Sequence, residues 1–258
     1  MVNYFDLTGR AAVVTGASSG LGADAALAYA GCGADVALLA RREDKLLEIQ
    51  KKIESLGRKA LAVQCDVTDE KSIKGAVGQV LKEFGKIDIL LNNAGIAQGG
   101  DSIRLTEDQW NNSMNINVRS AFLMAKYVVP GMIERKYGKI VNIASINAVL
   151  GDKVDELARH AYNASKSAVL GLTKGMCASY ARHNITVNAI GPGLFETEMT
   201  ENTLFKHNAF MQSYSMRCPA GRAARRGELN GTVLYFSSDA SSYVNGQFVI
   251  VDGGTSSV

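Results

Sequence analysis

The chain passes from a short apolar run into a segment of helical period through Thr15-Gly16-Ala17-Ser18-Ser19-Gly20-Leu21-Gly22. Gly16 frees the backbone for a turn, Gly20 lets a diphosphate approach closely, and Gly22 lets helix and strand pack tightly. A helix that begins here directs backbone N–H groups at phosphate. The pattern therefore predicts a dinucleotide-binding turn, with an ordinary tight turn as the alternative. Its candidate contacts are Gly16, Ser18, Ser19, Gly20, Leu21 and Gly22.

Outward from this turn, short aliphatic runs alternate with longer segments of helical period along the whole chain. Such alternation predicts βα units and a buried parallel sheet. The expected strands are 11–15, 35–40, 59–64, 87–91, 138–144, 185–190 and 248–251, and the expected helices are 20–30, 43–55, 70–84, 107–134 and 161–182. The predicted fold is α/β, a doubly wound parallel sheet of seven strands with helices on both faces. We expect 194–218, rich in Met and Phe, to be an irregular lid.

The composition fits one globular domain. The chain has 258 residues, 47% of them apolar, and no Pro- or Ser-rich linker, so a single domain over 1–258 is expected. A formal net charge of +3, with basic residues scattered among acids, argues against nucleic-acid binding. No apolar run reaches the roughly 20 residues that span a bilayer, and the N-terminus lacks a signal pattern, so we expect no membrane association and a cytoplasmic protein. The cysteines and histidines show no ligand spacing, and no metal is expected.

The end of the second expected strand indicates which nicotinamide cofactor is used. A carboxylate at this position accepts a hydrogen bond from a free ribose 2′-hydroxyl, whereas arginine accommodates a 2′-phosphate. The chain has Ala40 here, followed by Arg41 and Arg42. Two guanidinium groups match a doubly charged phosphate, so NADP(H) is predicted over NAD(H). The alternative is that both arginines only pair with Glu43 and Asp44.

Tyr162 and Lys166 are candidates for proton transfer. They are four residues apart in an expected helix, so they share a face. At ~4 Å and an effective dielectric of ~20, the ammonium would stabilise a tyrosinate by on the order of 4 kcal/mol. That corresponds to ~3 pK units below a reference of ~10. We therefore expect Lys166 to lower the pKa of Tyr162, which makes the phenol a usable acid or base near neutral pH.

Two further strand ends carry polar or small residues. Asp66 and Val67 follow the third expected strand, and Asn93, Ala94 and Gly95 follow the fourth. An aspartate here could accept from an adenine amino group, and a small-residue turn lets a nucleotide lie against backbone. Both segments could also be plain strand caps. Because the carboxyl ends of parallel strands share one sheet edge, the coincidence favours a cofactor site.

With these motifs in this order, the chain resembles the short-chain dehydrogenase/reductase family over essentially its whole length. The resemblance implies a Rossmann-type domain, a nicotinamide cofactor, hydride transfer at a secondary alcohol carbon, and a homotetramer. It implies that Tyr162 is the general acid/base and that Lys166 binds the nicotinamide ribose. It further implies that Ser145 orients the substrate oxygen and that Asn117 holds a water of the proton relay. The segment around Pro192, Gly193 and Thr197 resembles the one that binds the carboxamide.

The substrate is expected to be a small carbonyl or alcohol compound. The charged segment 152–160 is longer than the usual family connection, and Asn147, Arg159 and His160 could contact a polar or anionic substrate; a solvated loop is the alternative. Among family members the chain is most similar to the gluconate 5-dehydrogenase type, which favours a sugar acid, and to the 3-oxoacyl-carrier-protein reductase type. A hydroxysteroid dehydrogenase also stays open. The non-enzymatic alternative is an NADP-sensing regulator, which would be expected to lack the Ser-Tyr-Lys set.

Overall fold

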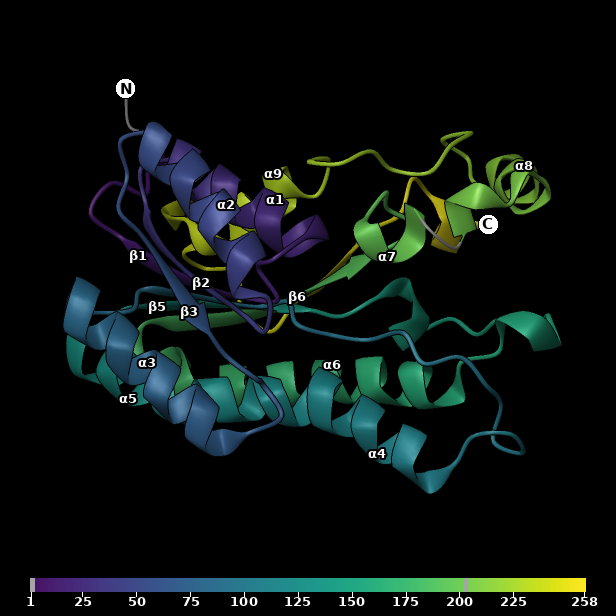
Figure 1. Ribbon diagram of the computed structural model, residues 1–258, viewed down its shortest axis with the longest axis horizontal. Coiled ribbons are helices and arrows are strands. Elements are labelled where there is room, and N and C mark those ends of the chain that lie inside the picture. The colour runs from purple at the N-terminus through teal and green to yellow at the C-terminus, as the bar shows by residue number, and fades with distance from the viewer. Residues whose placement is uncertain (1–2, 202–203) are drawn as a thin grey trace.

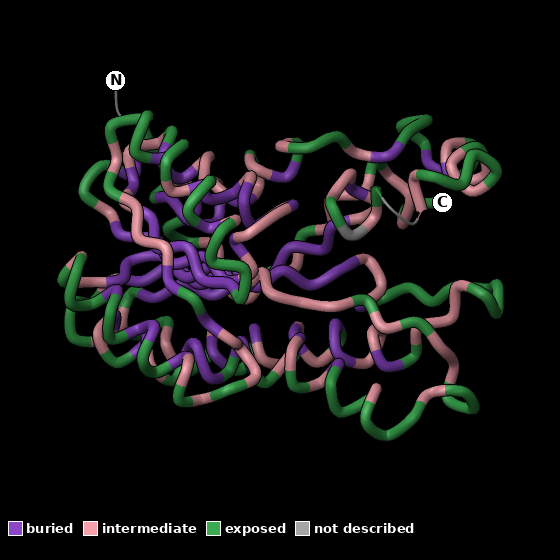
Figure 2. Tube along the Cα trace, in the orientation of Figure 1, coloured by how far each residue is buried: buried purple, intermediate pink, exposed green. Residues whose placement is uncertain are grey.

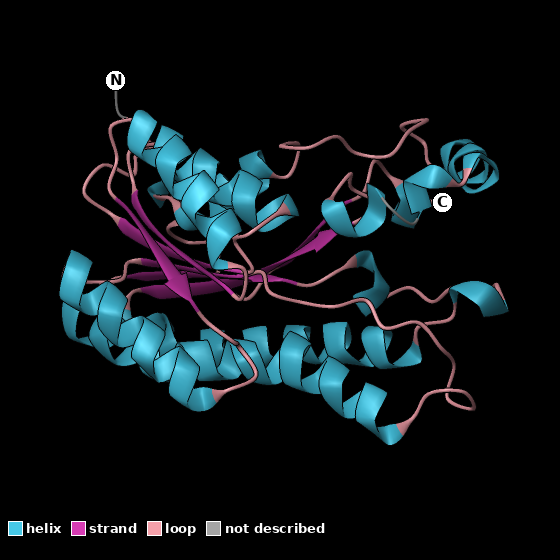
Figure 3. Ribbon diagram, in the orientation of Figure 1, coloured by secondary structure: helices cyan, strands magenta, loops and turns pink. Residues whose placement is uncertain are grey.

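The computed structural model describes residues 3–201 and 204–258, which fold around one parallel sheet. The strand order is β3-β2-β1-β4-β5-β6-β7. Helices cover both faces of the sheet, so that Figure 3 shows three layers. The predicted doubly wound α/β fold is therefore confirmed. The strands are β1 (Ala11–Thr15), β2 (Asp35–Ala40), β3 (Ala60–Gln64), β4 (Ile89–Asn92), β5 (Gly138–Ile143), β6 (Ile185–Pro192) and β7 (Phe248–Val251).

Two groups of helices enclose the sheet (Figure 1). One layer contains α1 (Gly20–Gly31), α2 (Glu43–Ser55) and α9 (Asn230–Ser237). The other contains α3 (Glu70–Phe84), α4 (Glu107–Met114), α5 (Ser120–Arg135) and α6 (His160–Tyr180). The segment beyond β6 adds α7 (Glu198–Glu201) and α8 (Asn208–Arg217).

The helix ends follow local sequence signals. In α4, the Thr106 side chain accepts from the Gln109 backbone N–H and the Gln109 side chain accepts from the Thr106 backbone N–H, which is a capping box. In α3, Asp69 caps the first turn by accepting from the Lys71 backbone N–H. The same helix ends at Gly85, which has a left-handed φ of 73° that glycine adopts without strain.

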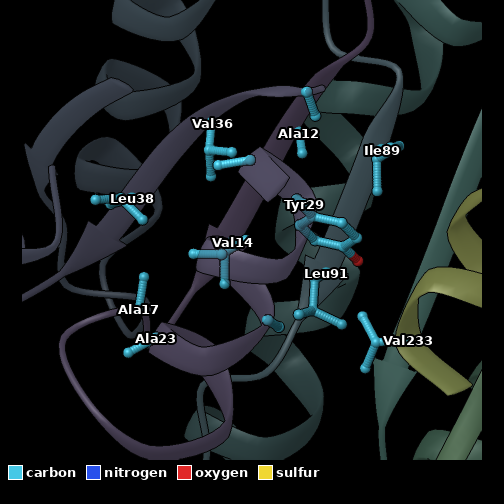
Figure 4. Packing of buried hydrophobic residues seen from close by; sticks show 14 of the residues in the cluster. Ala12, Val14, Ala17, Ala23, Tyr29, Val36, Leu38, Ile89, Leu91 and Val233 are labelled. Carbon is cyan, nitrogen blue, oxygen red and sulfur yellow. The ribbon is translucent and has the colours of Figure 1, made fainter. Parts of the chain in front are cut away.

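The core lies on both faces of the sheet. Every residue of β1, β4, β5 and β6 is buried, and Figure 2 shows burial concentrated along the sheet and the helix faces that pack on it. Tyr29 of α1 is among the largest fully buried side chains, and its hydroxyl is 2.7 Å from the Ser237 hydroxyl of α9. Figure 4 shows Tyr29 among aliphatic side chains of β1, β2, β4 and α9. This packing fixes α1, and with it the turn that precedes the helix.

Two predictions about helices were wrong. The expected helix 107–134 is interrupted by a π-helical turn at Asn115–Arg119, which separates α4 from α5. The expected irregular segment 194–218 contains α7, a short 3-10 turn at Leu204–Lys206, and α8. The sequence interpretation also did not predict α9. The remaining boundaries differ from expectation by at most two residues.

The strand order places the functional region. After β3 the chain crosses to the other side of β1 and adds β4, so the helices that follow β1 and β4 lie on opposite faces of the sheet. Ligands of open α/β sheets bind outside the strand carboxyl ends at such a switch point. In this protein the turn after β1 and the segment after β4 meet there.

Candidate active site

The turn after β1 is closed by small residues. Gly16 has a φ of +65°, and a Cβ built on it would lie 2.9 Å from the Cα of Ala94. Gly20 has a φ of +54°, and its Cβ would lie 3.2 Å from the Cβ of Thr197. Helix α1 begins at Gly20, after Ser19 in an extended conformation. The backbone thus turns into a helix N-terminus with no side chain at Gly20, an arrangement that fits a diphosphate.

Asn93 holds this turn against the end of β4. Its side-chain amide donates to the carbonyls of Thr15 (2.9 Å) and Gly16 (3.2 Å). The Thr15 hydroxyl accepts from the backbone N–H groups of Asn93 (3.0 Å) and Ala94 (3.1 Å). Asn93 therefore positions the glycine-rich turn through its side chain, while its neighbours provide a small-residue surface.

A cavity of about 590 Å³ extends along this edge of the sheet, within the ordinary size of a ligand pocket. Most sequence-predicted cofactor and catalytic residues line it. These are Gly16, Ser18, Ser19, Gly20, Leu21, Arg41, Arg42, Asp66, Val67, Asn93, Ala94, Gly95, Ser145, Tyr162, Lys166, Pro192, Gly193 and Thr197. Of the predicted set, Gly22 and Asn117 are not in the cavity lining; Gly22 lies in the first turn of α1.

Ser145, Tyr162 and Lys166 come together from the end of β5 and the start of α6. The Ser145 hydroxyl accepts from the backbone N–H of Asn147 at 3.1 Å and donates to its Oδ1 at 3.4 Å. Lys166 is buried, and its Nζ donates to the carbonyl of Ile143 at 2.8 Å. The ammonium lies 5.7 Å from the centroid of the Tyr162 ring.

The expectation that Lys166 lowers the pKa of Tyr162 was wrong, because the pKa of the phenol is raised. Burial raises the pKa of the Tyr162 phenol, and the Ser145 hydroxyl and the Arg159 charge offset this only in part. Burial also lowers the pKa of Lys166 to about 8. The reason is that a low-dielectric site disfavours both the tyrosinate and the ammonium, and that the Lys166 Nζ is engaged by a backbone carbonyl.

Asn117 lies in the π-helical turn, directly behind the cavity. Its Oδ1 accepts from the backbone N–H of Ile96 at 2.8 Å, and its Nδ2 donates to the Ile96 carbonyl at 3.0 Å and to the Ser165 hydroxyl at 2.8 Å. A Cβ on Gly95 would lie 3.1 Å from Asn117 Oδ1 and 3.3 Å from Lys166 Nζ. The Asn117 side chain therefore fixes the chain after β4 beside the lysine. Its role with a water molecule stays a prediction.

Arg41 and Arg42 differ in their surroundings. Arg42 is bound by Glu198 through both carboxylate oxygens, each at 2.7 Å, so the expected alternative pairing with Glu43 and Asp44 is not what holds it. Among the residues that the structure describes, no carboxylate lies within ion-pair distance of Arg41. Asp66 is held by Thr68, whose backbone N–H and hydroxyl lower the pKa of the carboxyl.

The three residues suggested for substrate contact lie outside the cavity lining. Asn147 is bound to Ser145 and lies 3.4 Å from Asp152. The Arg159 Nε lies 3.7 Å from Asp152 Oδ2, which makes an ion pair. The Arg159 charge also lowers the pKa of the Tyr162 phenol. His160 accepts at Nδ1 from the backbone N–H of Ser102 at 3.0 Å. Contact of any of them with a substrate stays a prediction.

Several cavity residues were not predicted. Ile96, Ala97 and Ile116 provide an apolar wall, and Glu198 provides a carboxylate. The position of Ile96 and Ala97 directly after Gly95 was a usable signal. No sequence pattern links Glu198 to Arg42, which precedes it by 156 residues.

Among residues 3–201 and 204–258, no cluster of three or more His, Cys, Asp or Glu side chains is arranged to hold a metal ion. No helix among them has the length and apolarity needed to cross a membrane.

A glycine-rich strand-to-helix turn and a buried phenol line one cavity at the switch point, an arrangement typical of dinucleotide-dependent oxidoreductases. A family model described as enoyl-(acyl-carrier-protein) reductase matches residues 16–256. The chain is 41% identical over 255 residues to gluconate 5-dehydrogenase of Gluconobacter oxydans, covering 98% of this chain and 96% of that protein. It is 37% identical over 248 residues to 3-oxoacyl-(acyl-carrier-protein) reductase of Thermotoga maritima, covering 96% and 98%.

A solved structure of a related enzyme has the same fold. Gluconate 5-dehydrogenase from Burkholderia cenocepacia, in complex with NADP and tartrate, superposes with a TM-score of 0.93 at 36% identity, covering 99% of this chain and 98% of that one. The chain therefore belongs to the short-chain dehydrogenase/reductase family and is an NAD(P)-dependent enzyme acting on CH–OH groups.

Proposed function

We propose that this enzyme interconverts a ketone and a secondary alcohol on a sugar acid with NADP(H), and that Tyr162 is the general acid/base. The observation that carries the proposal is the single cavity lined by the glycine-rich turn, by Arg41, and by Ser145 with Tyr162. The relatives named gluconate 5-dehydrogenase support the substrate class, and the relative solved with NADP supports the cofactor.

The cofactor residues divide by task. The turn from Gly16 to Gly22 would hold the diphosphate, and Arg41 with Arg42 the 2′-phosphate. Asp66, Val67, Asn93, Ala94 and Gly95 would flank the adenosine, and Lys166, Pro192, Gly193 and Thr197 the nicotinamide ribose and carboxamide. When bound, the nicotinamide supplies or accepts the hydride.

The chain's own residues manage the proton. Tyr162 would give its phenolic proton to the ketone oxygen as negative charge develops there, and would take it back in the oxidative direction. Ser145 would donate a hydrogen bond to the same oxygen. Burial raises the pKa of the phenol further above neutral pH, so the protonated form required for reduction predominates. Asn117 would support a water of the proton relay behind the lysine.

Arg159 supports an anionic substrate. Its guanidinium is half-buried and close enough to Tyr162 to lower the pKa of the phenol. A charge in this position can bind a carboxylate whose chain reaches the phenol. Asn147 and His160 would add polar contacts from the same connection.

A matched substrate pair tests this proposal. 5-Keto-D-gluconate and L-sorbose share the ketone and differ by a carboxylate in place of a hydroxymethyl group. We expect NADPH oxidation, followed by absorbance, to give a kcat/KM at least about tenfold higher for the keto acid, the range of a charge-assisted hydrogen bond. Arg159→Gln should remove most of that preference. Equal use of both sugars by the unaltered enzyme would contradict the sugar-acid proposal.

One alternative is a 3-oxoacyl-carrier-protein reductase, which the Thermotoga maritima relative favours. The same assay with an acetoacetyl thioester distinguishes the two, since an acyl reductase would prefer the thioester over the keto acid. Turnover of a hydroxysteroid would favour the third substrate class. Tight NADPH binding with no turnover of any of these compounds would favour the sensor.

We infer a cytoplasmic homotetramer of single-domain subunits that acts on a small-molecule substrate and binds neither nucleic acid nor membrane. In each subunit, 194–218 would act as the lid, formed by α7, α8 and their connections.

A further inference from the structure

Arg42 is fully engaged in this structure. Its guanidinium binds both oxygens of Glu198 at 2.7 Å, the Ser19 hydroxyl at 2.9 Å and the Ser18 hydroxyl at 3.1 Å. Ser18 and Ser19 belong to the glycine-rich turn after β1, and Glu198 is the first residue of α7. Arg42 therefore joins α7 to the turn that would hold the cofactor phosphates.

The same two segments also touch through Thr197. A Cβ on Gly20 would lie 3.2 Å from Thr197, so the residue before Glu198 packs directly on the start of α1. Thr197 is tied into α7 by its carbonyl, which accepts from the backbone N–H of Glu201 at 2.8 Å. The Arg42–Glu198 pair thus adds a second contact between α7 and the glycine-rich turn, besides the packing of Thr197 on Gly20.

Arg41 provides the contrast. It lines the same cavity, and among the described residues no carboxylate pairs with it. A carboxylate binds the guanidinium of Arg42 directly, whereas Arg41 acts on Asp66 only through its charge, which lowers the pKa of that carboxyl. The two arginines are therefore consecutive in sequence, but only the guanidinium of Arg42 is directly paired with a carboxylate among the described residues.

We propose that Glu198 competes with the cofactor 2′-phosphate for Arg42, so that NADP(H) displaces Glu198 and releases α7, whereas NAD(H) leaves the pair in place. This inference rests on the proposed use of NADP(H). It makes Glu198 a residue that determines cofactor selectivity, and it couples the choice of cofactor to the position of α7.

The exchange is physically favourable. Both partners of the pair are about half exposed, with side-chain exposures of 44% for Arg42 and 50% for Glu198, and exposed ion pairs contribute little net stability. A phosphate monoester carries nearly two negative charges and three acceptor oxygens. It therefore outcompetes one carboxylate for the same guanidinium. A 2′-hydroxyl has no charge and cannot.

Two nucleotides that differ only in the 2′-phosphate test the competition without catalysis. Affinities of 2′,5′-ADP and 5′-AMP would be measured by calorimetry on the unaltered enzyme and on Glu198→Gln. The variant should bind 2′,5′-ADP about fivefold more tightly, since an exposed pair contributes up to about 1 kcal/mol. Its affinity for 5′-AMP should stay within about twofold. Glu201→Gln, an exposed acid on the same short helix, is the matched control and should change neither affinity.

Hydrogen exchange of the peptide that contains 194–201 gives a second readout. NADPH should speed exchange in α7 of the unaltered enzyme and NADH should not, while in Glu198→Gln exchange should be fast from the start. An unchanged or weaker affinity of Glu198→Gln for 2′,5′-ADP would overturn the competition. Equal tightening for 5′-AMP would overturn it as well. An unaltered enzyme that binds 5′-AMP as tightly as 2′,5′-ADP, with Glu198→Gln preferring 2′,5′-ADP, would overturn the proposed NADP(H) preference but not the competition.

Discussion

At the scale of single residues, burial disfavours the charged forms of both Tyr162 and Lys166. The sequence predicted that the amine would lower the pKa of the phenol, but the Lys166 Nζ donates to the carbonyl of Ile143. Burial raises the pKa of Tyr162 and lowers that of Lys166 to about 8.

The role of Tyr162 can be tested by removing one oxygen atom. Tyr162→Phe keeps the ring and its packing but cannot transfer a proton. Since general acid catalysis contributes about 10²- to 10⁴-fold, kcat should fall by about that factor while the Kd for NADPH changes little. Stopped-flow turnover and fluorescence titration measure the two quantities. Full turnover by the variant would remove Tyr162 from the mechanism.

Lys166 should leave a signature in the pH dependence of stability. Its pKa is about 8 in the fold and ~10.4 in the unfolded chain. Between these values the unfolded state binds more protons, so the contribution of Lys166 to the free energy of unfolding rises with pH. Below pH 8 the buried charge costs about 3 kcal/mol, a cost that disappears as pH approaches 10.4.

Lys166→Met isolates this effect. The stability of the variant relative to the unaltered protein, from urea unfolding without nucleotide, should decline by about 3 kcal/mol between pH 7 and 10.5. In this variant the Ile143 carbonyl loses its hydrogen bond, which lowers the free energy of unfolding by the same amount at every pH. This loss therefore shifts the difference between the two proteins without changing how that difference depends on pH. Lys174→Met, on the exposed side of α6, is the control for the loss of a lysine from the same helix. A flat curve for Lys166→Met would contradict the lowered pKa.

The residues of the cavity were largely predictable, and the reason is local. Once a parallel sheet is inferred, glycines at a strand-to-helix turn and small or polar residues at strand ends can be assigned to the ligand-binding edge. The reason is that the carboxyl ends of all the strands lie at that edge. The state of Arg42 was not predictable. Its partner Glu198 is 156 residues away, and nothing in either local sequence indicates that they meet.

At the scale of elements, the sequence predicted the regular strands and long helices but not the π-helical turn that interrupts one of them. The strands were predicted to within two residues because they are short apolar runs, and α2 and α3 because apolar residues repeat along them at helical spacing. Helix α1 was predicted from the glycine-rich turn at which it begins. A π-helical turn adds one residue to a turn without any composition signal, so the break at Asn115–Arg119 was missed. That break falls at Asn117, whose buried side chain holds Ile96.

The short helices were missed for a different reason. Helices α7, α8 and α9 have 4, 10 and 8 residues, and helices this short depend on tertiary contacts more than on their own sequence. In α8 only Tyr214 is buried, so no apolar stripe marks the inner face. The Met and Phe residues that suggested a lid are therefore partly helical and partly connecting residues.

At the scale of the whole molecule, apolar side chains are exposed on several faces, and two of these faces could pair with another subunit. On the α4–α5 layer, Trp110 is 41% and Phe122 is 50% exposed. At one edge of the sheet, β7 exposes Val249 at 37%, and in the described parts of the chain no strand pairs with its outer side. A single isologous interface gives a dimer, whereas two different ones give a tetramer with D2 symmetry. Two such surfaces are consistent with the proposed homotetramer.

Charge placed on one surface at a time should dissect the assembly. Light scattering should give four times the 27.5 kDa of one chain for the unaltered protein. Phe122→Glu and Val249→Glu should each give dimers, because a carboxylate buried in an apolar interface has no partner, and the double variant should give monomers. Leu56→Glu is the control, since Leu56 is 52% exposed at the end of α2, away from both surfaces, and it should stay tetrameric. Tetramers in all variants would show that neither surface is an interface. A monomeric unaltered protein would contradict the assembly itself, and would leave each exposed apolar side chain as an isolated surface residue of the kind that monomers tolerate.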